Sequence, residues 1–379
     1  MSIITKPIRI YLDTSDYNEL AKENTDYSDV KEFILNGVET GKISTGYSYP
    51  IIFELFRKYD TKHKPERLRI ARFLKTVCRS NAFPYISDLR AGAQFPNNGI
   101  WMPLEALESF SPKALNDYLW DNIRNRIAKD ERIPRKIRRQ IKSKSGYLDL
   151  VRNLPYREFN KSDFPDMPIS DEILASGSLQ GFIRGSVHAV SLSKELTRWL
   201  GDPEAFIQLW YEYSGRDNPL EKVVMDSFQK LSTAFETLKT QMKSVDEMYR
   251  TAKKAHSDLH KRLHSADLPK DVLSSITLPE RPSRPKLPDA NLTLDDKIGP
   301  GRSGHFNHYF NALRDDRIKP LPSDFIDLIH LVYLKDVDLI RCDRRMANLM
   351  RGCQTIDSTK IVGSLRDLPE AIQRIATTH

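Results

Sequence analysis

The chain has 379 residues, and its content of 39% hydrophobic and 29% charged residues is ordinary for a globular protein. No run of about 18 apolar residues occurs and no apolar leader begins the chain, so we expect neither a transmembrane helix nor a signal peptide. The three cysteines are scattered and form no CxxC pair, which argues against a disulfide framework or a cysteine zinc site and fits a cytoplasmic protein. The net charge of +8 is compatible with a nucleic-acid partner without demonstrating one.

Residues 1–90 alternate between strand-like and helix-like segments, which is typical of a parallel α/β sheet. Residues 8–13 alternate apolar with other side chains and predict a strand that ends at Asp13. Glu54 falls on an apolar helical segment shortly after a β-prone stretch at 42–48. Helices are expected over residues 16–23, 28–40, 51–60 and 65–78.

Residues 91–309 lose that alternation and predict a mainly helical insertion, with helices at 113–129 and within 187–213. Its segment 129–144 contains eight Lys or Arg and only two acids. These cations either form a solvated helix face or contact the phosphates of a nucleic acid, while the aromatic residues Trp120, Tyr147 and Tyr156 stack on its bases. The candidate phosphate-binding residues are Arg135, Lys136, Arg138, Arg139 and Lys142.

Residues 219–265 contain apolar side chains spaced alternately by four and three, with no internal proline or glycine. This period of about 3.5 residues predicts one long, coiled-coil-like helix that packs against another helix of the chain or forms a homodimer or a contact with a partner protein. His256, His260 and His264 lie on one face of it, as a solvated stripe or a zinc site. The proline-rich residues 266–304 predict a linker.

The α/β alternation returns in residues 310–379, with a helix at 323–334, a strand at 337–343 and a closing helix at 369–379. Asp343 ends this strand as Asp13 ends the first one. Because ligand sites form at the carboxyl ends of parallel strands, we expect the two ends of the chain to share one site.

Carboxylates gathered at such an edge are the ligands that Mg²⁺ and Mn²⁺ prefer, and the bound ion promotes phosphodiester hydrolysis. Each acid also has a structural alternative: Asp13 and Asp324 as helix caps, Glu54 and Asp343 in ion pairs with nearby arginines or lysines, and Asp327 in solvent. His330 either orients a substrate or packs in the core. The candidate metal ligands are Asp13, Glu54, Asp324, Asp327 and Asp343, with Asp16 and Asp338 as secondary candidates.

The order of these motifs resembles that of PIN-domain ribonucleases: LDTS at 12–15, a segment from Ser48 to Glu54, an acidic helix at 324–330 and a strand ending in Asp343. The resemblance covers roughly residues 1–90 and 310–379. One departure is Arg341, which stands where the family usually has Thr. The resemblance implies a PIN-like α/β/α sandwich with a central, mostly parallel sheet, interrupted by the helical insertion.

The same resemblance implies a catalytic site in which Asp13, Glu54, Asp324 or Asp327, and Asp343 bind Mg²⁺ or Mn²⁺, with Ser15 and Ser48 in support. The expected function is a metal-dependent endoribonuclease acting on single-stranded RNA, as in a regulated toxin or a defence effector. The alternatives are a non-catalytic PIN-like scaffold that binds RNA or protein, and a DNA-directed nuclease.

Overall fold

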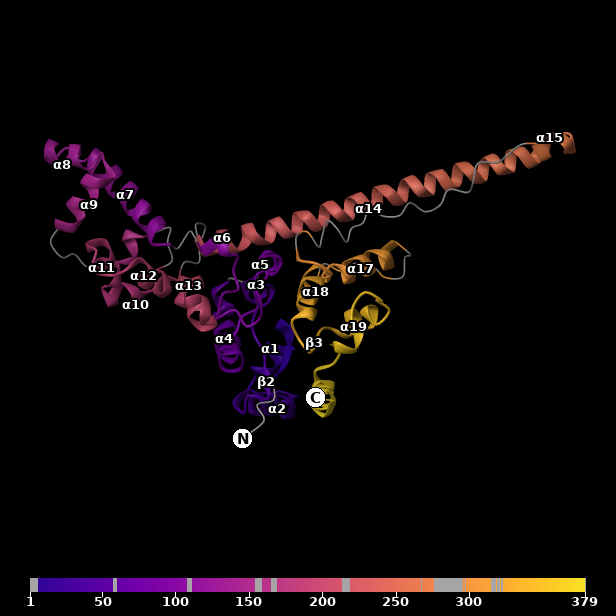
Figure 1. Ribbon diagram of the computed structural model, residues 1–379, viewed down its shortest axis with the longest axis horizontal. Helices are drawn as coiled ribbons and strands as arrows, with labels where there is room; N and C mark the ends of the chain where they lie inside the picture. Colours follow the sequence, from indigo (N-terminus) through magenta and orange to yellow (C-terminus); the bar gives the residue numbers. More distant parts are fainter. Residues whose placement is uncertain are drawn as a thin grey trace.

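A four-stranded, all-parallel sheet joins the two ends of the chain, as the sequence predicts (Figure 1). Its order is β2-β1-β3-β4, and Ile10 of β1 lies beside Leu339 of β3. The strands are β1 Ile8–Tyr11, β2 Ile43–Ser44, β3 Leu339–Arg341 and β4 Ile361–Val362. The computed structural model describes residues 6–56, 60–107, 111–153, 159–164, 169–212, 219–266, 268–275, 296, 298–314, 318, 321 and 323–378.

Both faces of the sheet are covered. Ile10 and Tyr11 point to opposite faces of β1, and both are fully buried, as the central strand of a parallel sheet requires. The C-terminal helix α20 packs on β1 and β3. The helices around the sheet are α1 Thr14–Leu20, α2 Ser28–Glu39, α3 Tyr49–Phe56, α4 Lys64–Cys78, α5 Ile86–Arg90, α17 Gly304–Arg314, α18 Asp324–Leu331, α19 Arg344–Met350 and α20 Leu368–Thr378.

The core of the sheet also includes side chains from the middle of the sequence. Helix α13 (Pro203–Glu212) packs along α4 and buries Phe206 and Trp210 in this core. Helix α17, which begins at the last residue of the expected linker, contributes Phe306 and Tyr309 from the end of the segment expected to be an insertion. We call the strands, the helices around them and α13 the sheet unit; it draws on residues outside 1–90 and 310–379.

A second, smaller core lies in residues 112–197, which we call the helical lobe (Figure 1). Leu115 and Leu119 of its first helix belong to one core with Phe164, Ile173 and other apolar side chains from later segments of the lobe. Because it has its own buried core, the lobe is a separate packing unit. Its helices are α7 Pro112–Lys129, α8 Arg135–Gln140, α9 Lys144–Asn153, α10 Asp171–Ser176, α11 Ser178–Arg184 and α12 Ala189–Thr197.

The long helix α14 spans Pro219–Ser265, the range that its apolar spacing predicts. It runs over the sheet unit and projects past it, with α15 (Lys270–Ser275) at its far end (Figure 1). Met248 and Leu259 in its second half are exposed, and the coiled-coil pairing itself stays a prediction. The short helix α6 (Leu104–Leu107) links the sheet unit to the lobe. None of the helices described has the length and apolar character needed to cross a membrane.

Candidate metal centre at the carboxyl edge of the sheet

Asp13 and Asp343 occupy equivalent positions on neighbouring strands. Each follows its strand by two residues and caps the next helix: Asp13 Oδ1 accepts a hydrogen bond from the Ser15 amide at 3.4 Å, and Asp343 Oδ1 accepts one from the Met346 amide at 2.7 Å. Since β1 and β3 are paired and parallel, both carboxylates lie at the same edge of the sheet. The capping role that the sequence allows is therefore present, and it coexists with a shared location.

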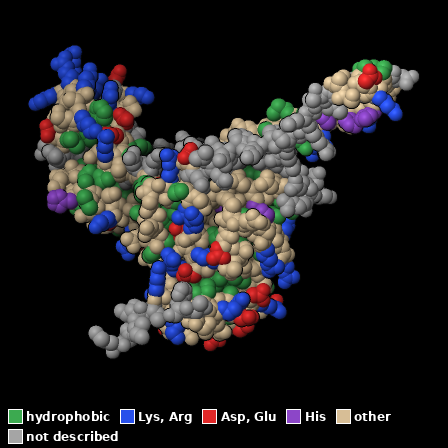
Figure 2. Space-filling view, turned by 45° about the vertical axis from the view of Figure 1, so that its right-hand side comes forward, with side chains coloured by type: hydrophobic (Ala, Val, Ile, Leu, Met, Phe, Trp, Pro, Cys, Tyr) green, Lys and Arg blue, Asp and Glu red, His purple; other side chains and the backbone are tan. Residues whose placement is uncertain are grey.

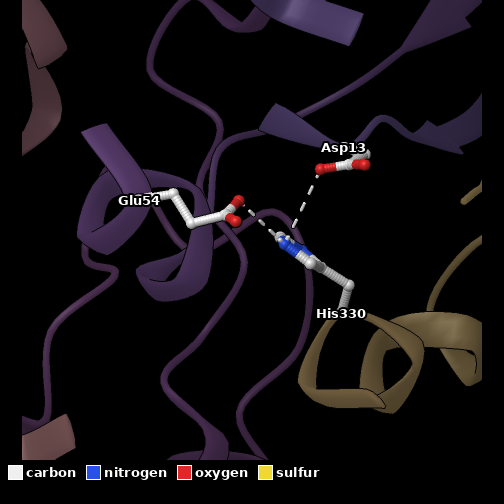
Figure 3. A group of neighbouring side chains, drawn as sticks. All are labelled: Asp13, Glu54 and His330. Carbon is white, nitrogen blue, oxygen red and sulfur yellow. Dashed lines mark hydrogen bonds and ion pairs between the residues drawn. The ribbon is translucent and has the colours of Figure 1, made fainter. Parts of the chain in front are cut away.

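Glu54 of α3 and His330 of α18 approach this edge from two further elements (Figure 3). His330 Nε2 lies 3.3 Å from Glu54 Oε2 and 3.9 Å from Asp13 Oδ1. One ligand atom from each of these three residues lies within 4.8 Å of the others, and theirs is the one such group of three found among the described residues. A single divalent cation could contact all three side chains.

The other side of the His330 ring is held by a chain of buried hydroxyl groups. Its Nδ1 lies 2.6 Å from the Tyr11 hydroxyl, which lies 2.6 Å from Ser48 Oγ. Ser48 thus supports the site through Tyr11 and His330. Burial lowers the pKa of His330, but Glu54, Asp13 and Asp327 more than offset that effect and raise it overall. The imidazole is therefore fixed with Nε2 toward the acids.

Asp327 faces the same group of acids from α18. Its Oδ2 is buried and has no hydrogen-bond donor in the described part of the chain. Burial is the main cause that raises its pKa to about 7; the charges of Asp343, Asp13 and Glu54 add to it, and His330 opposes it. An orphaned buried carboxylate oxygen among other carboxylates fits a divalent cation, which would supply the missing positive charge.

Asp324, one helical turn away from Asp327, serves the fold. Its side chain is 1% exposed and accepts hydrogen bonds from the Tyr309 hydroxyl at 2.6 Å and the Leu321 amide at 2.7 Å, and it pairs with Arg345. Burial alone would raise the pKa of Asp324, but these donors, Arg345 foremost, lower it overall. Both oxygens are occupied, so Asp327 is the acid of α18 that faces the cluster.

Arg341 binds the outer side of Asp13. Its Nη1 lies 3.5 Å from Asp13 Oδ2 and 3.3 Å from Ser15 Oγ, and its Nε lies 3.0 Å from Asp16 Oδ1. Ser15 Oγ donates to Asp13 Oδ2 at 3.0 Å, in the supporting position expected for it. Asp16 is buried, and burial raises its pKa to about 8 despite Arg341. Ser15 and Arg341 therefore hold Asp13 Oδ2 in place, and Arg341 also pairs with the buried Asp16.

The remaining candidates lie elsewhere. Asp338 pairs with Arg9, whose amide donates to Asp338 Oδ2 at 2.8 Å, and so ties β1 to the start of β3. His260 and His264 lie side by side on α14, with ring centroids 4.5 Å apart and the rings tilted by 48°. From the sequence, His330 could either pack in the core or orient a substrate. In the structure its side chain is buried, and it also points toward the acids. The sequence did contain one indication that His330 lies near the acids: it follows Asp327 by three residues, and residues at this spacing share a helix face.

No family model, curated protein or solved structure matches this chain.

Proposed function

We propose that this chain is a metal-dependent nuclease with a PIN-like fold that hydrolyses phosphodiester bonds of single-stranded RNA. The observation that carries the proposal is the meeting of Asp13 and Glu54 with His330. Asp327 lies near enough for the charges of Asp13, Glu54 and Asp343 to raise its pKa, and its buried Oδ2 has no donor among the described residues. Residues from opposite ends of the chain supply these acids. Burying several carboxylates together opposes folding, so their retention favours a cation-binding function.

The four carboxylates would hold Mg²⁺ or Mn²⁺, since hard oxygen ligands suit both ions. Once bound, such an ion lowers the pKa of water and stabilises charge on the phosphoryl oxygens. Ser15 and Arg341 hold Asp13 in place through its Oδ2. Tyr11 fixes His330 so that Nε2 is placed to hold or move a proton at the edge of the acid cluster.

A second candidate function is a non-catalytic scaffold that binds RNA or protein. Two contacts favour it: Arg341 lies against Asp13 and Asp16, and His330 lies against Glu54. These cationic groups neutralise part of the acidic charge without a metal ion. The two functions differ in whether the acid cluster binds Mn²⁺.

The decisive experiment measures Mn²⁺ binding by electron paramagnetic resonance and cleavage of end-labelled single-stranded RNA by the full chain. We expect Asp13→Asn to reduce both by at least about 100-fold, because even groups that only orient metal ligands usually contribute about 10- to 100-fold. Asp29→Asn is the matched control, since Asp29 is exposed on α2 and should change neither value.

Cleavage that persists in EDTA, or in the Asp13→Asn variant, would contradict the nuclease proposal. RNA binding without any Mn²⁺ binding would support the scaffold instead. Single-stranded and branched DNA are tested in parallel, and preferential cleavage of either would make the chain a DNA-directed nuclease that uses the same acids.

A further inference from the structure

A concentrated basic surface lies on the helical lobe, away from the acid cluster. It is formed by residues 129–144, around α8 and the start of α9, and we call it the basic tip. In Figure 1, α8 stands at the outer end of the lobe, and Figure 2 shows Lys and Arg side chains gathered at that end. The tip holds eight Lys or Arg and two acids within a chain whose net charge is +8.

Most of these cations have no acidic partner in the part of the chain that the structure describes. Arg132 pairs with Asp130 at 2.9 Å, and Lys144 pairs with Asp117. The hydrogen bonds from Arg132 lower the pKa of Asp130, and Asp130 also lies close enough to Arg138 for the charge of that guanidinium to lower it further. The described residues provide no ion pair for the other six cations, and apart from Lys129 at the start of the segment these are the five at its centre. These five, which we call the tip cations, are Arg135, Lys136, Arg138, Arg139 and Lys142.

Three of the tip cations lie on one face of α8, and Lys142 follows that helix. Arg135, Arg138 and Arg139 are separated by three and four positions, which share one face of a helix, and Lys142 lies in the turn after Gln140, where α8 ends. Four of the five side chains are exposed, and Arg138 is half-buried. Because like charges at this spacing repel each other, the arrangement favours a polyanionic partner that brings several negative charges at once.

The apolar side chains of the tip face the interior of the lobe. Ile141 is buried, Ile137 is half-buried, and Tyr147 belongs to the core of the lobe. No large exposed hydrophobic residue occurs among residues 129–144, all of which the structure describes. A membrane-binding helix needs such an apolar face toward the lipid, so the tip fits a water-exposed phosphate backbone better.

The aromatic residues near the tip contribute less than the sequence suggested. Tyr147 is buried and cannot stack on a base, and Tyr156 lies outside the described residues. Trp120 is half-buried, with the Arg124 guanidinium 5.4 Å from its ring. Without exposed aromatic platforms, binding at the tip would depend on charge and be strongly sensitive to salt.

We infer that the basic tip is an anchoring surface for the phosphodiester backbone of single-stranded RNA, separate from the acid cluster. The choice of RNA rests on the proposed nuclease function, whereas the choice of a polyanion rests on the tip cations alone. Since the tip stands at the far end of the lobe from the sheet, only a long strand can contact both sites (Figure 1). The tip would then favour long substrates over short ones.

The test is a binding titration with fluorescent single-stranded RNA in EDTA, so that no cleavage is needed. Changing the five tip cations to Gln should weaken binding about 10- to 100-fold at low salt and reduce the slope of log affinity against log salt by up to about 3.5. The control changes five exposed cations of α14 to Gln and should have little effect: Lys243, Arg250, Lys253, Lys254 and Lys261.

Equal losses from the tip variant and the α14 variant would overturn the inference, because they would mean that only net charge matters. Equally tight binding of wild-type protein to polyglutamate or to phosphatidylserine vesicles would also overturn it. Circular dichroism must show that both variants keep the helix content of the wild type; since four of the tip cations are exposed, we expect no loss.

Cleavage assays separate this inference from the proposed function. If both hold, the tip variant loses cleavage of long RNA and keeps cleavage of an oligonucleotide too short to reach the tip. Asp13→Asn should have the opposite effects. It should stop cleavage of both substrates and leave RNA affinity in EDTA unchanged. A tip variant with unchanged affinity for long RNA refutes the anchoring surface and leaves the nuclease proposal standing.

Discussion

The acid cluster of the sheet unit and the basic tip of the helical lobe carry charge of opposite sign and expose it to water to different degrees. In the sheet unit, Asp327 is largely buried beside other carboxylates and keeps an oxygen without a donor. In the lobe, the basic tip keeps most of its cations in water. Burying an ionised group opposes folding by several kcal/mol unless it is paired, whereas exposing one costs little. The acids therefore indicate a site by their location alone, whereas the tip cations do so because the described residues form no ion pair with them.

The same contrast exists on a smaller scale within α18. Asp324 and Asp327 are three residues apart, yet Asp324 is satisfied by Arg345, Tyr309 and the Leu321 amide, and Asp327 is not. The carboxylate of Asp324 is satisfied within the fold, whereas Asp327 keeps a buried oxygen with no hydrogen-bond donor among the described residues. The next predictions test this division, beginning with the largest expected effect.

Arg345→Ala should cause the largest loss of stability. It removes the cationic partner of a buried carboxylate, and a broken pair of this kind typically lowers the free energy of unfolding by about 3–5 kcal/mol. Since the Arg345 side chain is 33% exposed, we expect the lower end of that range, about 3 kcal/mol. Urea denaturation measures it, with Arg344→Ala at the exposed neighbouring position as control. Equal stability of the two variants would show that Asp324 does not depend on its ion pair.

Glu54→Gln should leave the fold intact and remove Mn²⁺ binding. The amide keeps the shape of the side chain but loses its negative charge, so Mn²⁺ affinity should fall by at least about 30-fold. Differential scanning calorimetry with and without Mn²⁺ measures it, because an ion that binds only the folded state raises the melting temperature. Glu32→Gln on the exposed face of α2 is the control. A full Mn²⁺-dependent shift in Glu54→Gln would remove Glu54 from the metal centre.

Several elements of the fold could be predicted from the sequence because their signals are local. The first strand, the long helix at 219–265 and the closing helix follow from periodicity, and the structure confirms all three, although the strand ends at Tyr11, two residues before the predicted Asp13. The pairing of the first strand with the late one followed from the order of the acidic motifs and is confirmed by β1 and β3. The tight packing of α13 on α4 had no local signal, because it depends on two segments far apart in the sequence.

The sequence predicted the candidate acids and the supporting Ser15 and Ser48, but it did not predict the contacts made by Tyr11, Arg341 and Arg345. Asp324 and Asp327 could not be told apart, since only the fold brings Arg345 and Tyr309 to one of them. In the sequence Tyr11 is one residue of a predicted strand. Its hydrogen bond to His330 could not be predicted, because it joins residues at opposite ends of the chain. Arg341 read as a departure from the family, and the structure shows it bracing Asp13 and Asp16. Local spacing carries none of these long-range contacts.

Asp327→Asn should produce the smallest effect, a gain in stability that depends on pH. The folded protein raises the pKa of Asp327 from its ordinary 3.8 to about 7. Below about pH 4 the carboxyl group is protonated in both states and the penalty is absent. Between pH 4 and 7 the unfolded chain releases this proton while the folded chain keeps it, so the stability of the wild type falls relative to a variant that cannot ionise.

In EDTA at pH 8, Asp327→Asn should therefore be more stable than the wild type, and at pH 4 the two should be equal. A shift of about three units corresponds to about 4 kcal/mol, and solvent access to the carboxylate reduces the expected difference to about 1–2 kcal/mol. Adding Mn²⁺ at pH 8 should reverse the order, since only the wild type gains from the ion. A variant that is less stable than the wild type in EDTA at pH 8 would mean that Asp327 is a partner in the fold, as Asp324 is. The reversal is the sharper result, because it requires one carboxylate to weaken the metal-free protein and to strengthen the metal-bound one.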